Sequence, residues 1–414
     1  MGKNRELALN KCQPEVELAF SLAEYKDRLD KIKKRMFSDN IDLLWLSSPE
    51  SLFYVSGYSC EWYQAQSPKS WPATSGIAIH LEYDDFILFD TPSEQIMCRF
   101  VTCSKDTRIF PIGERRDGVQ FIIDELNAKG WLNCCVGMEF QSYRPNPNVS
   151  KRFHSAFESS NCKVVDGSDI LRDVRWIKSP QEIKYIEEAA KITDIGLNAA
   201  KNTICAGITE LEVWGEIMRA MAKAGGENPS ITLPVLSGLK ANTGHSLSSR
   251  KKIRAGEQIN VDVSGVFNRY HCNAARSFFL GDPPKDIVDF YSKASGVFNI
   301  INKLLKPGLS VGELVRACRE YYENTGIFSE AGWVGGYELG LAFPPDWVGN
   351  FVYEITDEKS KKIFDAGTVV NYESQFFGPR LTGITYTICT LLFKKDQAYF
   401  PVKTARELII LNNL

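Results

Sequence analysis

The amino-acid sequence predicts an α+β protein with an N-terminal α/β domain followed by a second domain of long helices and antiparallel strands. At 414 residues the chain exceeds what one hydrophobic core normally supports. Short β-rich runs alternate with helical segments up to about residue 170, and beyond it long helices precede paired strand-like runs. We therefore predict an N-terminal extension at 1–20, a first domain at 21–170 and a second domain at 171–414.

The first domain is predicted to begin with a helix and to continue as short strands. Residues 22–36 have helical spacing, and residues 118–131 form an amphipathic pattern that ends at Gly130. The predicted strands are DLLWLSS (42–48), GIAIHL (76–81), DFILFD (85–90) and VGMEF (136–140). Only the first 20 residues are expected to be disordered.

The second domain is predicted to start with a helix at the Ser179-Pro180 step. Serine suits the N-cap of a helix and proline its first turn. Two further helices are predicted at 287–305 and 311–326. The first has apolar residues along one helical face, and a glycine follows the first helix and ends the second. The strands of one antiparallel sheet are predicted from β-branched and aromatic runs at 258–267, 367–377 and 384–393.

Composition excludes several classes of function. With 49 basic and 51 acidic residues there is no broad footprint for nucleic acid or for an anionic membrane. No stretch has the roughly 18 to 20 apolar residues that span a bilayer, and the N-terminal residues lack the apolar core of an export signal. We therefore expect a cytoplasmic protein whose eleven cysteines are reduced thiols and not nucleophiles, Cys272 being the one whose neighbours make it worth checking.

Two carboxylates stand out because they interrupt apolar strands. Asp262 lies in INVDVSG and Glu373 in VVNYESQFF. A buried carboxylate must be hydrogen-bonded, paired or held in a polar pocket, since burying it alone is costly. Strand alternation could equally place either side chain on a solvated face, and the two strands alone do not decide between these interpretations.

Three loops are the other candidates for a site. His245 lies in GLKANTGHSLSSRKK, a loop of small polar residues that suits proton transfer or simply a surface position. His271 is a weaker candidate of the same kind. GGYELGLAFPPDW (335–347) is interpreted as a pocket wall or a surface turn, and the aromatic segment 56–71 as a ligand cover or an interdomain or subunit contact.

Together these segments resemble the creatinase, aminopeptidase P and methionine aminopeptidase superfamily, whose catalytic domain has the pita-bread fold. The likeness runs over most of the chain, and its markers are the junction IKSPQEIKYIEEAAKITDIG (177–196) and the module that begins VDVSG (261–265). It implies a creatinase-type α/β domain followed by a pita-bread catalytic domain. It also implies a homodimer in which the N-terminal domain contributes to the partner's site.

Members of this superfamily that bind metal use two aspartates, a histidine in a GHxxG turn and two glutamates. Carried over residue by residue, these positions are Asp262, Asn273, Tyr337, Glu373 and Thr385. Only the first and the fourth keep a carboxylate, which is too little anionic ligation for two divalent cations. The resemblance therefore implies a site without metal ions or another cofactor.

The metal-free branch, which includes creatinase and ectoine hydrolase, is more similar, and the run PPDW resembles ectoine-hydrolase-like members. It implies metal-independent hydrolysis of a C–N bond in a small cationic guanidino or cyclic amidine compound. His245 would transfer the proton, and Asp262 and Glu373 would hold the cationic group and act in catalysis. Substrate-binding roles are implied for Trp62, Tyr63, Gln66, His271, Asn273 and Tyr337.

Two departures weigh against creatine itself as the substrate. Ala275 precedes Arg276 where creatinase has a glutamate, and Ala65 replaces an arginine expected to bind a carboxylate. Two alternatives stay open. One is a metal-dependent Xaa-Pro peptidase with unusual ligands, and the other is a non-catalytic pita-bread module that binds a ligand or a partner.

Overall fold

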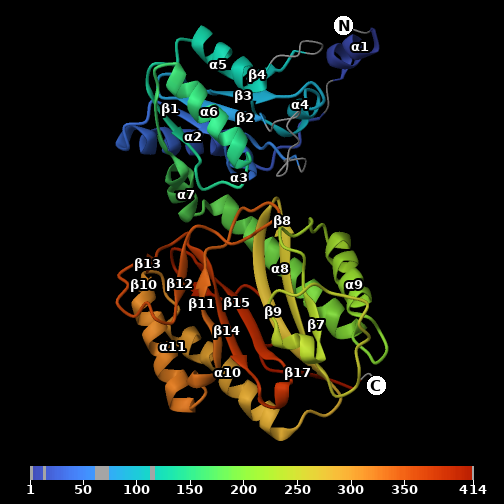
Figure 1. Cartoon of the computed structure of the whole chain (residues 1–414). Coiled ribbons are helices and arrows are strands. Elements are labelled where there is room, and N and C mark those ends of the chain that lie inside the picture. Colours follow the sequence, from blue (N-terminus) through green and yellow to red (C-terminus); the bar gives the residue numbers. More distant parts are fainter. Residues whose placement is uncertain (1–2, 13–14, 61–73, 112–116, 413–414) are drawn as a thin grey trace. The chain divides into compact units, whose positions relative to one another are not determined.

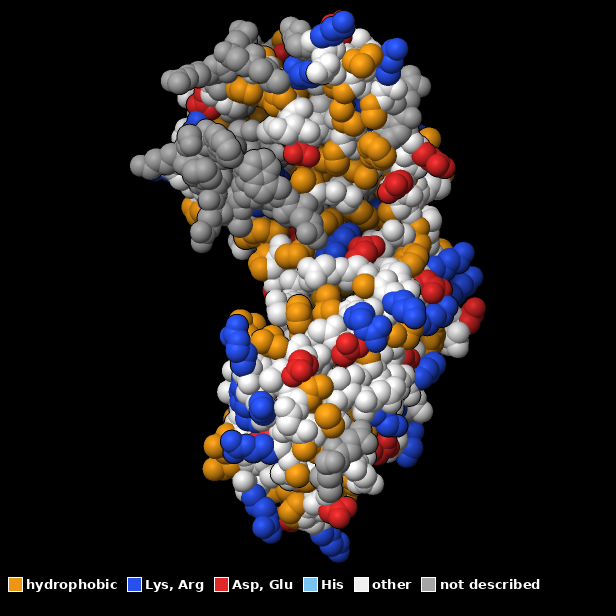
Figure 2. All heavy atoms as spheres, turned by 90° about the vertical axis from the view of Figure 1, so that its right-hand side faces the viewer, with side chains coloured by type: hydrophobic (Ala, Val, Ile, Leu, Met, Phe, Trp, Pro, Cys, Tyr) orange, Lys and Arg blue, Asp and Glu red, His pale blue; other side chains and the backbone are white. Residues whose placement is uncertain are grey.

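The computed structural model describes residues 3–12, 15–60, 74–111 and 117–412. The chain divides into two compact units, Met1–Arg175 and Trp176–Leu414 (Figure 1). Within the described ranges no helix is both long and apolar enough to cross a bilayer. On the face shown in Figure 2, basic side chains are interspersed with acidic and apolar ones over the C-terminal unit.

The N-terminal unit is built on a six-stranded mixed sheet in the order β4-β3-β2-β1-β5-β6. Its strands are β1 Leu43–Leu46, β2 Gly76–His80, β3 Phe86–Asp90, β4 Asp106–Ile109, β5 Cys135–Met138 and β6 Lys163–Asp166. Its helices are α1 Lys3–Lys11, α2 Leu22–Ser38, α3 Pro49–Ser56, α4 Met97–Val101, α5 Gly118–Ala128, α6 Pro147–Ser159 and α7 Ser168–Trp176. The core centres on Trp45 of β1, whose ring lies 5.0 Å from that of Phe153 on α6.

The C-terminal unit contains a nine-stranded sheet whose main order is β12-β11-β14-β15-β9-β8-β7. Its long strands are β8 Gln258–Phe267, β9 Tyr270–Leu280, β11 Ala331–Tyr337, β14 Val369–Phe377 and β15 Ile384–Phe393. The shorter strands are β7 Val235–Ser237, β10 Leu309–Ser310, β12 Val352–Glu354, β13 Ile363–Phe364, β16 Ala398–Tyr399 and β17 Ile409–Leu411. A separate ribbon pairs β10 with β13.

Four helices accompany this sheet, α8 Pro180–Thr203, α9 Glu210–Lys223, α10 Lys285–Leu304 and α11 Val311–Thr325 (Figure 1). Three short 3₁₀ turns complete the unit, η1 Gly238–Asn242, η2 Phe328–Glu330 and η3 Pro379–Leu381. Helix α8 packs on β8 and β9, and α10 packs on β14 and β15. A side chain at Gly265 of β8 would meet the Ala189 carbonyl at 2.1 Å, so glycine there permits the close approach of α8.

Most elements expected from the sequence are confirmed. The helix after Ser179 begins with a capping box, in which Ser179 and Glu182 exchange hydrogen bonds with each other's backbone amides. The strands β8, β14 and β15 lie in one antiparallel sheet. The expectation of disorder over the first 20 residues is wrong for Lys3–Lys11, which form α1.

Candidate active site

The sheet register brings Asp262 and Glu373 to one face although they are far apart in the sequence. Asp262 of β8 pairs with Ala275 of β9, Ala275 pairs with Ile388 of β15, and Ile388 pairs with Glu373 of β14. Residues that pair directly in antiparallel strands point to the same face of a sheet. The two carboxylates therefore project from the same side, separated by two small or apolar neighbours.

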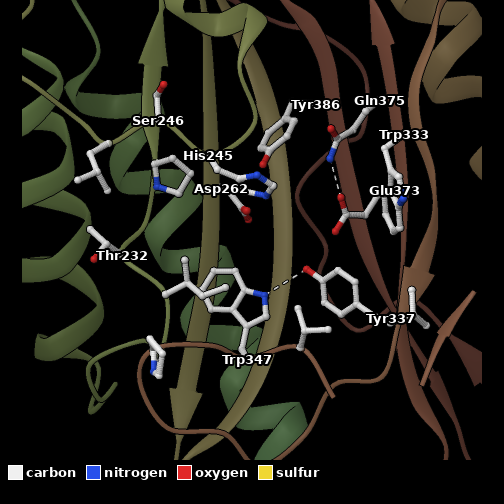
Figure 3. Close-up of a pocket in the computed structure, with 16 residues that line it drawn as sticks. Thr232, His245, Ser246, Asp262, Trp333, Tyr337, Trp347, Glu373, Gln375 and Tyr386 are labelled. Atoms are coloured by element: carbon white, nitrogen blue, oxygen red, sulfur yellow. Dashed lines mark hydrogen bonds between the residues drawn. The ribbon is translucent and has the colours of Figure 1, made fainter. Parts of the chain in front are cut away.

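This face forms one wall of a cavity of about 530 Å³ (Figure 3). Its lining comprises Ile231, Thr232, Pro234, His245, Ser246, Leu247, Asp262, Trp333, Tyr337, Pro345, Trp347, Val348, Val352, Glu373, Gln375 and Tyr386. Among these described lining residues the acids are Asp262 and Glu373, and none is lysine or arginine. Segment 335–347 is thus a cavity wall, contributed by Tyr337, Pro345 and Trp347.

Glu373 is a buried carboxyl group surrounded by hydrogen-bond donors. Gln375 donates to Oε2 at 2.6 Å, Asn371 donates to Oε1 at 2.9 Å, and the Tyr337 hydroxyl donates as well. Burial, and next the charge of Asp262, raise the pKa of Glu373 to about 8 despite these bonds. Glu373 without a cationic partner therefore keeps its proton near neutral pH.

Asp262 is buried in the same way, with fewer donors. The Asn273 amide donates to its Oδ1 at 2.6 Å, and the Tyr386 hydroxyl, which donates to the Gly244 carbonyl at 3.2 Å, lies close enough to favour the charged form of Asp262. Burial raises the pKa of Asp262 to about 7. Two acids with raised pKa values therefore face one small cavity, an arrangement typical of functional sites.

A pair of amide side chains connects these two acids. Asn371 Nδ2 lies 2.9 Å from Glu373 Oε1 and 3.4 Å from Asn273 Oδ1, while Asn273 Nδ2 contacts Asp262. The side-chain oxygen of Asn371, Oδ1, accepts a hydrogen bond from the Tyr337 backbone N–H at 2.8 Å. The buried Asn273 thus acts through Asp262 and Asn371, and it is not one of the residues that line the cavity.

Tyr337 links Glu373 to the cavity wall. Its hydroxyl accepts a hydrogen bond from Trp347 Nε1 at 3.1 Å and donates one to Glu373. Burial, with the charges of Glu373 and Asp262, raises the pKa of Tyr337 well above its ordinary value. Tyr337 is therefore a neutral donor that positions both Glu373 and the indole of Trp347.

Replacing Tyr337 by phenylalanine is expected to lower the unfolding free energy by about 1–3 kcal/mol, because the Trp347 N–H and Glu373 each lose a partner. It should also raise the pKa of Glu373 further, since a donor to its charged form is lost. Urea denaturation and an NMR titration of the carboxyl would measure both effects. Tyr291→Phe is the control, because Tyr291 is a buried tyrosine bonded to Thr387 at 2.8 Å, and a Glu373 shift in that variant would contradict the assignment.

His245 reaches the cavity from the loop between η1 and β8. Its side chain is exposed and lines the cavity, and Figure 3 draws its ring on the same side as Asp262 and Tyr386. The Tyr386 hydroxyl lies 3.2 Å from the carbonyl of Gly244, the residue before His245. His245 therefore lies where a functional group of this cavity would have to lie, at its lining.

His271 has a different position from the one expected. It is fully buried and is not one of the cavity-lining residues. Its Nε2 accepts the Ser230 amide at 3.1 Å, and its Nδ1 lies 3.0 Å from the Arg269 carbonyl. Burial, and next the charge of Arg269, lower the pKa of His271 to about 3, so the ring is neutral. Its position makes it a structural residue behind the wall and does not match a substrate contact.

Cys272 and Thr385 are not among the residues that line the cavity either. Burial raises the pKa of the Cys272 thiol to about 12, so the group lacks the thiolate that a nucleophile needs. Thr385 adjoins Tyr386, which lines the cavity, and strand alternation turns Thr385 to the opposite face. On β15, the face that bears the acids instead carries Tyr386 and Ile388.

Some predicted site residues lie outside the described part of the chain, namely Trp62, Tyr63 and Gln66. Conversely, sequence reasoning missed several residues that line the cavity or hold the acids, which are Trp333, Trp347, Asn371, Gln375 and Tyr386. For Asn371 and Gln375 the sequence did contain a signal. They stand two residues before and two residues after Glu373, so in a strand all three side chains point to the same face.

The donor set does not fit a pair of divalent cations. Among the described residues no group of three or more histidine, cysteine, aspartate or glutamate side chains is arranged to hold a metal ion. The Asn273 amide presents N–H to Asp262 where a metal would require an acceptor, and the Tyr337 phenol stays protonated. A mechanism through two metals has no ligand basis in this cavity.

Two family descriptions match the chain. Residues 184–390 match metallopeptidase family M24, and residues 28–177 match the creatinase/prolidase N-terminal domain. The first match alone spans half of the chain. The chain belongs to metallopeptidase family M24. The predicted fold, a creatinase-type domain followed by a pita-bread catalytic domain, is thereby confirmed.

The M24 relatives include enzymes of two kinds. An Xaa-Pro dipeptidase of Pyrococcus furiosus is 25% identical over 386 residues, covering 93% of this chain and all of the relative. An ectoine hydrolase of Halomonas elongata is 26% identical over 352 residues, covering 80% of this chain and 84% of the relative. The superfamily resemblance is confirmed, whereas membership of the metal-free branch stays a prediction.

Solved structures support the fold of this M24 member. The prolidase of Pyrococcus horikoshii has a TM-score of 0.76 at 22% identity, covering 92% of this chain and all of that chain. The N-terminal domain of a FACT complex subunit from chickpea has a TM-score of 0.72 at 15% identity, covering 94% and 99%. At these identities the likeness concerns the fold alone.

Proposed function

We propose that this M24 member is a hydrolase that cleaves a C–N bond in a small cationic molecule without a bound metal ion. The observation that carries the proposal is the pair of buried acids, Asp262 and Glu373, in a cavity whose described lining contains no lysine or arginine. The ectoine hydrolase relative supports it through its named substrate. The relatives named Xaa-Pro dipeptidase support the peptidase alternative better than they support this proposal.

A cationic group would supply what the two acids lack. Their raised pKa values mean that burial disfavours both negative charges. An amidinium or guanidinium between them would favour both ionised carboxylates and donate charge-assisted hydrogen bonds to their oxygens. Three aromatic walls, Trp333, Tyr337 and Trp347, offer faces on which a planar cation can stack.

Hydrolysis adds the hydroxyl of water to the carbon and its remaining proton to the leaving nitrogen. In one route His245 takes the proton from the attacking water and returns it to that nitrogen. In the other route a carboxylate attacks the carbon, and the leaving nitrogen takes a proton from solvent as the C–N bond breaks. Water then hydrolyses the covalent intermediate, which releases the carboxylate and a proton. Both routes use the same cavity, and Asp262 and Glu373 hold the substrate in the first.

The second candidate is a metal-dependent Xaa-Pro peptidase with unusual ligands, which the relatives that are Xaa-Pro dipeptidases favour. Against it stand the donor set described above and the proton-bearing Tyr337. A third candidate, a ligand-binding module without catalysis, has one point in its favour, because a FACT complex subunit has the same fold. Binding experiments separate these three candidates.

Protein purified without chelator is expected to contain much less than one transition-metal ion per chain. Added Mn²⁺, at about 1 mM, should leave the melting temperature unchanged, because only a ligand that binds the native state raises it. EDTA should also leave the melting temperature unchanged, because it would lower it only by removing a bound metal ion. Elemental analysis and thermal melting measure these outcomes. The double variant Asn273→Asp, Tyr337→His restores an acid and an imidazole, and it is expected to gain Mn²⁺-dependent stabilisation.

A thermal-shift panel of guanidino acids, ectoines and Xaa-Pro dipeptides tests the substrate class. Stabilisation by a guanidino or amidine compound in the presence of EDTA is the expected result. Stabilisation by dipeptides alone, and only in the presence of Mn²⁺, would contradict the proposal and favour the metal-dependent peptidase. A response followed by no turnover of the bound compound would favour the binding module.

A further inference from the structure

We infer that Glu210 is a positioning residue that closes the base of the loop carrying His245. This loop, residues 237–249, is called the His245 loop below. The inference rests on the proposed function only for the role of His245 in proton transfer. The structural part concerns Glu210 and the two ends of the loop.

Each carboxylate oxygen of Glu210 holds one end of the His245 loop. Oε1 accepts the backbone N–H of Ser237 and its hydroxyl, both at 2.9 Å. Oε2 accepts the backbone N–H of Ser249 and its hydroxyl, both at 2.9 Å, and Lys240 Nζ at 2.6 Å. The side chain is fully buried, so water does not compete for these bonds.

Glu210 projects from a rigid support. It is the first residue of α9, whose N-cap Thr209 forms a capping box with Glu212. The first helix amides also bind the chain that leaves the loop, Glu210 N to the Lys251 carbonyl at 3.1 Å and Leu211 N to the Ser249 carbonyl at 3.2 Å. The end of the helix and the base of the loop therefore form one hydrogen-bonded unit.

The negative charge of Glu210 is part of the closure. Burial opposes this charge, yet hydrogen bonds from Lys240, Ser249 and Ser237 hold the pKa of Glu210 below its ordinary value. All five groups that contact the two oxygens act as donors. A glutamine has one acceptor oxygen, so its NH₂ group would face donors at one end of the loop.

The geometry at the base affects the position of His245. The Tyr386 hydroxyl contacts the Gly244 carbonyl near the tip of the loop at 3.2 Å. The His245 side chain is exposed to the cavity, so the backbone of the loop determines where its ring lies. Because proton transfer requires hydrogen-bond reach, a loop released at its base would misplace the imidazole.

The test compares Glu210→Gln with Glu182→Gln in the full-length protein. Glu182 is a matched control, a buried glutamate that accepts the Ser179 amide and the Tyr270 hydroxyl, each at 2.7 Å, on another helix. Hydrogen exchange follows the amides of the His245 loop. An NMR spectrum of the four histidines follows the ring, with the His245 signal assigned by its loss in His245→Ala.

In Glu210→Gln the amides of Ser237 and Ser249 are expected to exchange about tenfold faster or more, because bonds to a charged acceptor are lost. The His245 signal should shift or broaden while the other three histidine signals stay in place. Glu182→Gln should leave the loop and the His245 signal unchanged. Unchanged exchange and an unchanged His245 signal in Glu210→Gln, or equal effects in both variants, would overturn the inference.

Ser249→Ala gives a second, milder measurement. It removes one hydroxyl donor from Oε2, so faster exchange in the loop is expected, with a smaller factor than in Glu210→Gln. If Glu210→Gln fails to fold, wild-type exchange in Ser249→Ala would overturn the inference by itself. Neither readout needs turnover, so an inactive protein or a fully active His245→Ala would refute the proposed function and leave this result interpretable.

Discussion

Raising the pH from 5 to 9 is expected to lower the unfolding free energy of the ligand-free protein through Asp262 and Glu373. Burial raises their folded-state pKa values to about 7 and about 8, above the ordinary values of 3.8 and 4.5. Between the unfolded and folded pKa values the folded state binds the extra proton, so stability falls as pH rises. At 1.36 kcal/mol per pKa unit, Asp262 contributes roughly 3 kcal/mol to this loss between pH 5 and its folded-state pKa, and Glu373 contributes roughly 4 kcal/mol.

Urea denaturation at unit steps of pH measures the slope. Asp262→Asn and Glu373→Gln each remove one titrating group, so each should flatten the decline. Glu210→Gln is the control, because the lowered pKa of Glu210 keeps it ionised in both states across this range and its slope should match that of the wild type. Slopes in the two acid variants that equal the wild-type slope would show that these carboxyls titrate normally.

The same linkage predicts that a cationic ligand binds more tightly as pH rises from 6 to 9. The ionised acids attract the cation, and binding it displaces their protons. Isothermal titration with a compound identified in the thermal-shift panel, in buffers of different ionisation enthalpy, would count the released protons. An affinity independent of pH would mean that the cation does not lie between Asp262 and Glu373.

Replacing His245 by alanine is expected to lower kcat by about 10²- to 10⁴-fold, the usual contribution of a positioned acid or base. Stability should change by less than about 0.5 kcal/mol, because the side chain is exposed. KM should change little, since the acids and aromatic walls that hold the substrate remain. Steady-state kinetics on the identified substrate and urea denaturation measure both quantities.

His154→Ala is the matched control for this variant. His154 is a partly exposed histidine on α6, paired with Glu158 at 3.2 Å, and it lies outside the cavity lining. It should retain wild-type kcat. Full activity of His245→Ala would remove the proton-transfer role and favour direct attack by a carboxylate.

Much of the fold was predictable because its signals are local. The Ser179-Pro180 step predicts the start of α8, since an N-cap hydroxyl and a proline are favourable only at a helix N-terminus. The strands β8, β14 and β15 follow from β-branched and aromatic runs. The positions that the family resemblance assigns to metal ligands could be located for the same reason, because motif spacing is visible in the sequence.

The site was only partly predictable, because its remaining members look ordinary in the sequence. A tyrosine in a β-rich run, such as Tyr386, is common in any sheet, and only pairing with neighbouring strands brings it to Asp262. The face of Thr385 and the burial of His271 likewise depend on register and packing, since a shift of one residue reverses a strand's faces. Sequence spacing alone carries no such information.

The sequence by itself determined the family, the order of the elements and the two acids that interrupt apolar strands. Asp262 and Glu373 were conspicuous because a carboxylate in an apolar strand is costly. Only the tertiary structure decided that Asn273 and Asn371 connect them, that Tyr337 holds Trp347, and that the described cavity lining contains no lysine or arginine. The physical reason is that hydrogen bonding and burial are properties of contacts between distant segments, which exist only after the sheet has formed.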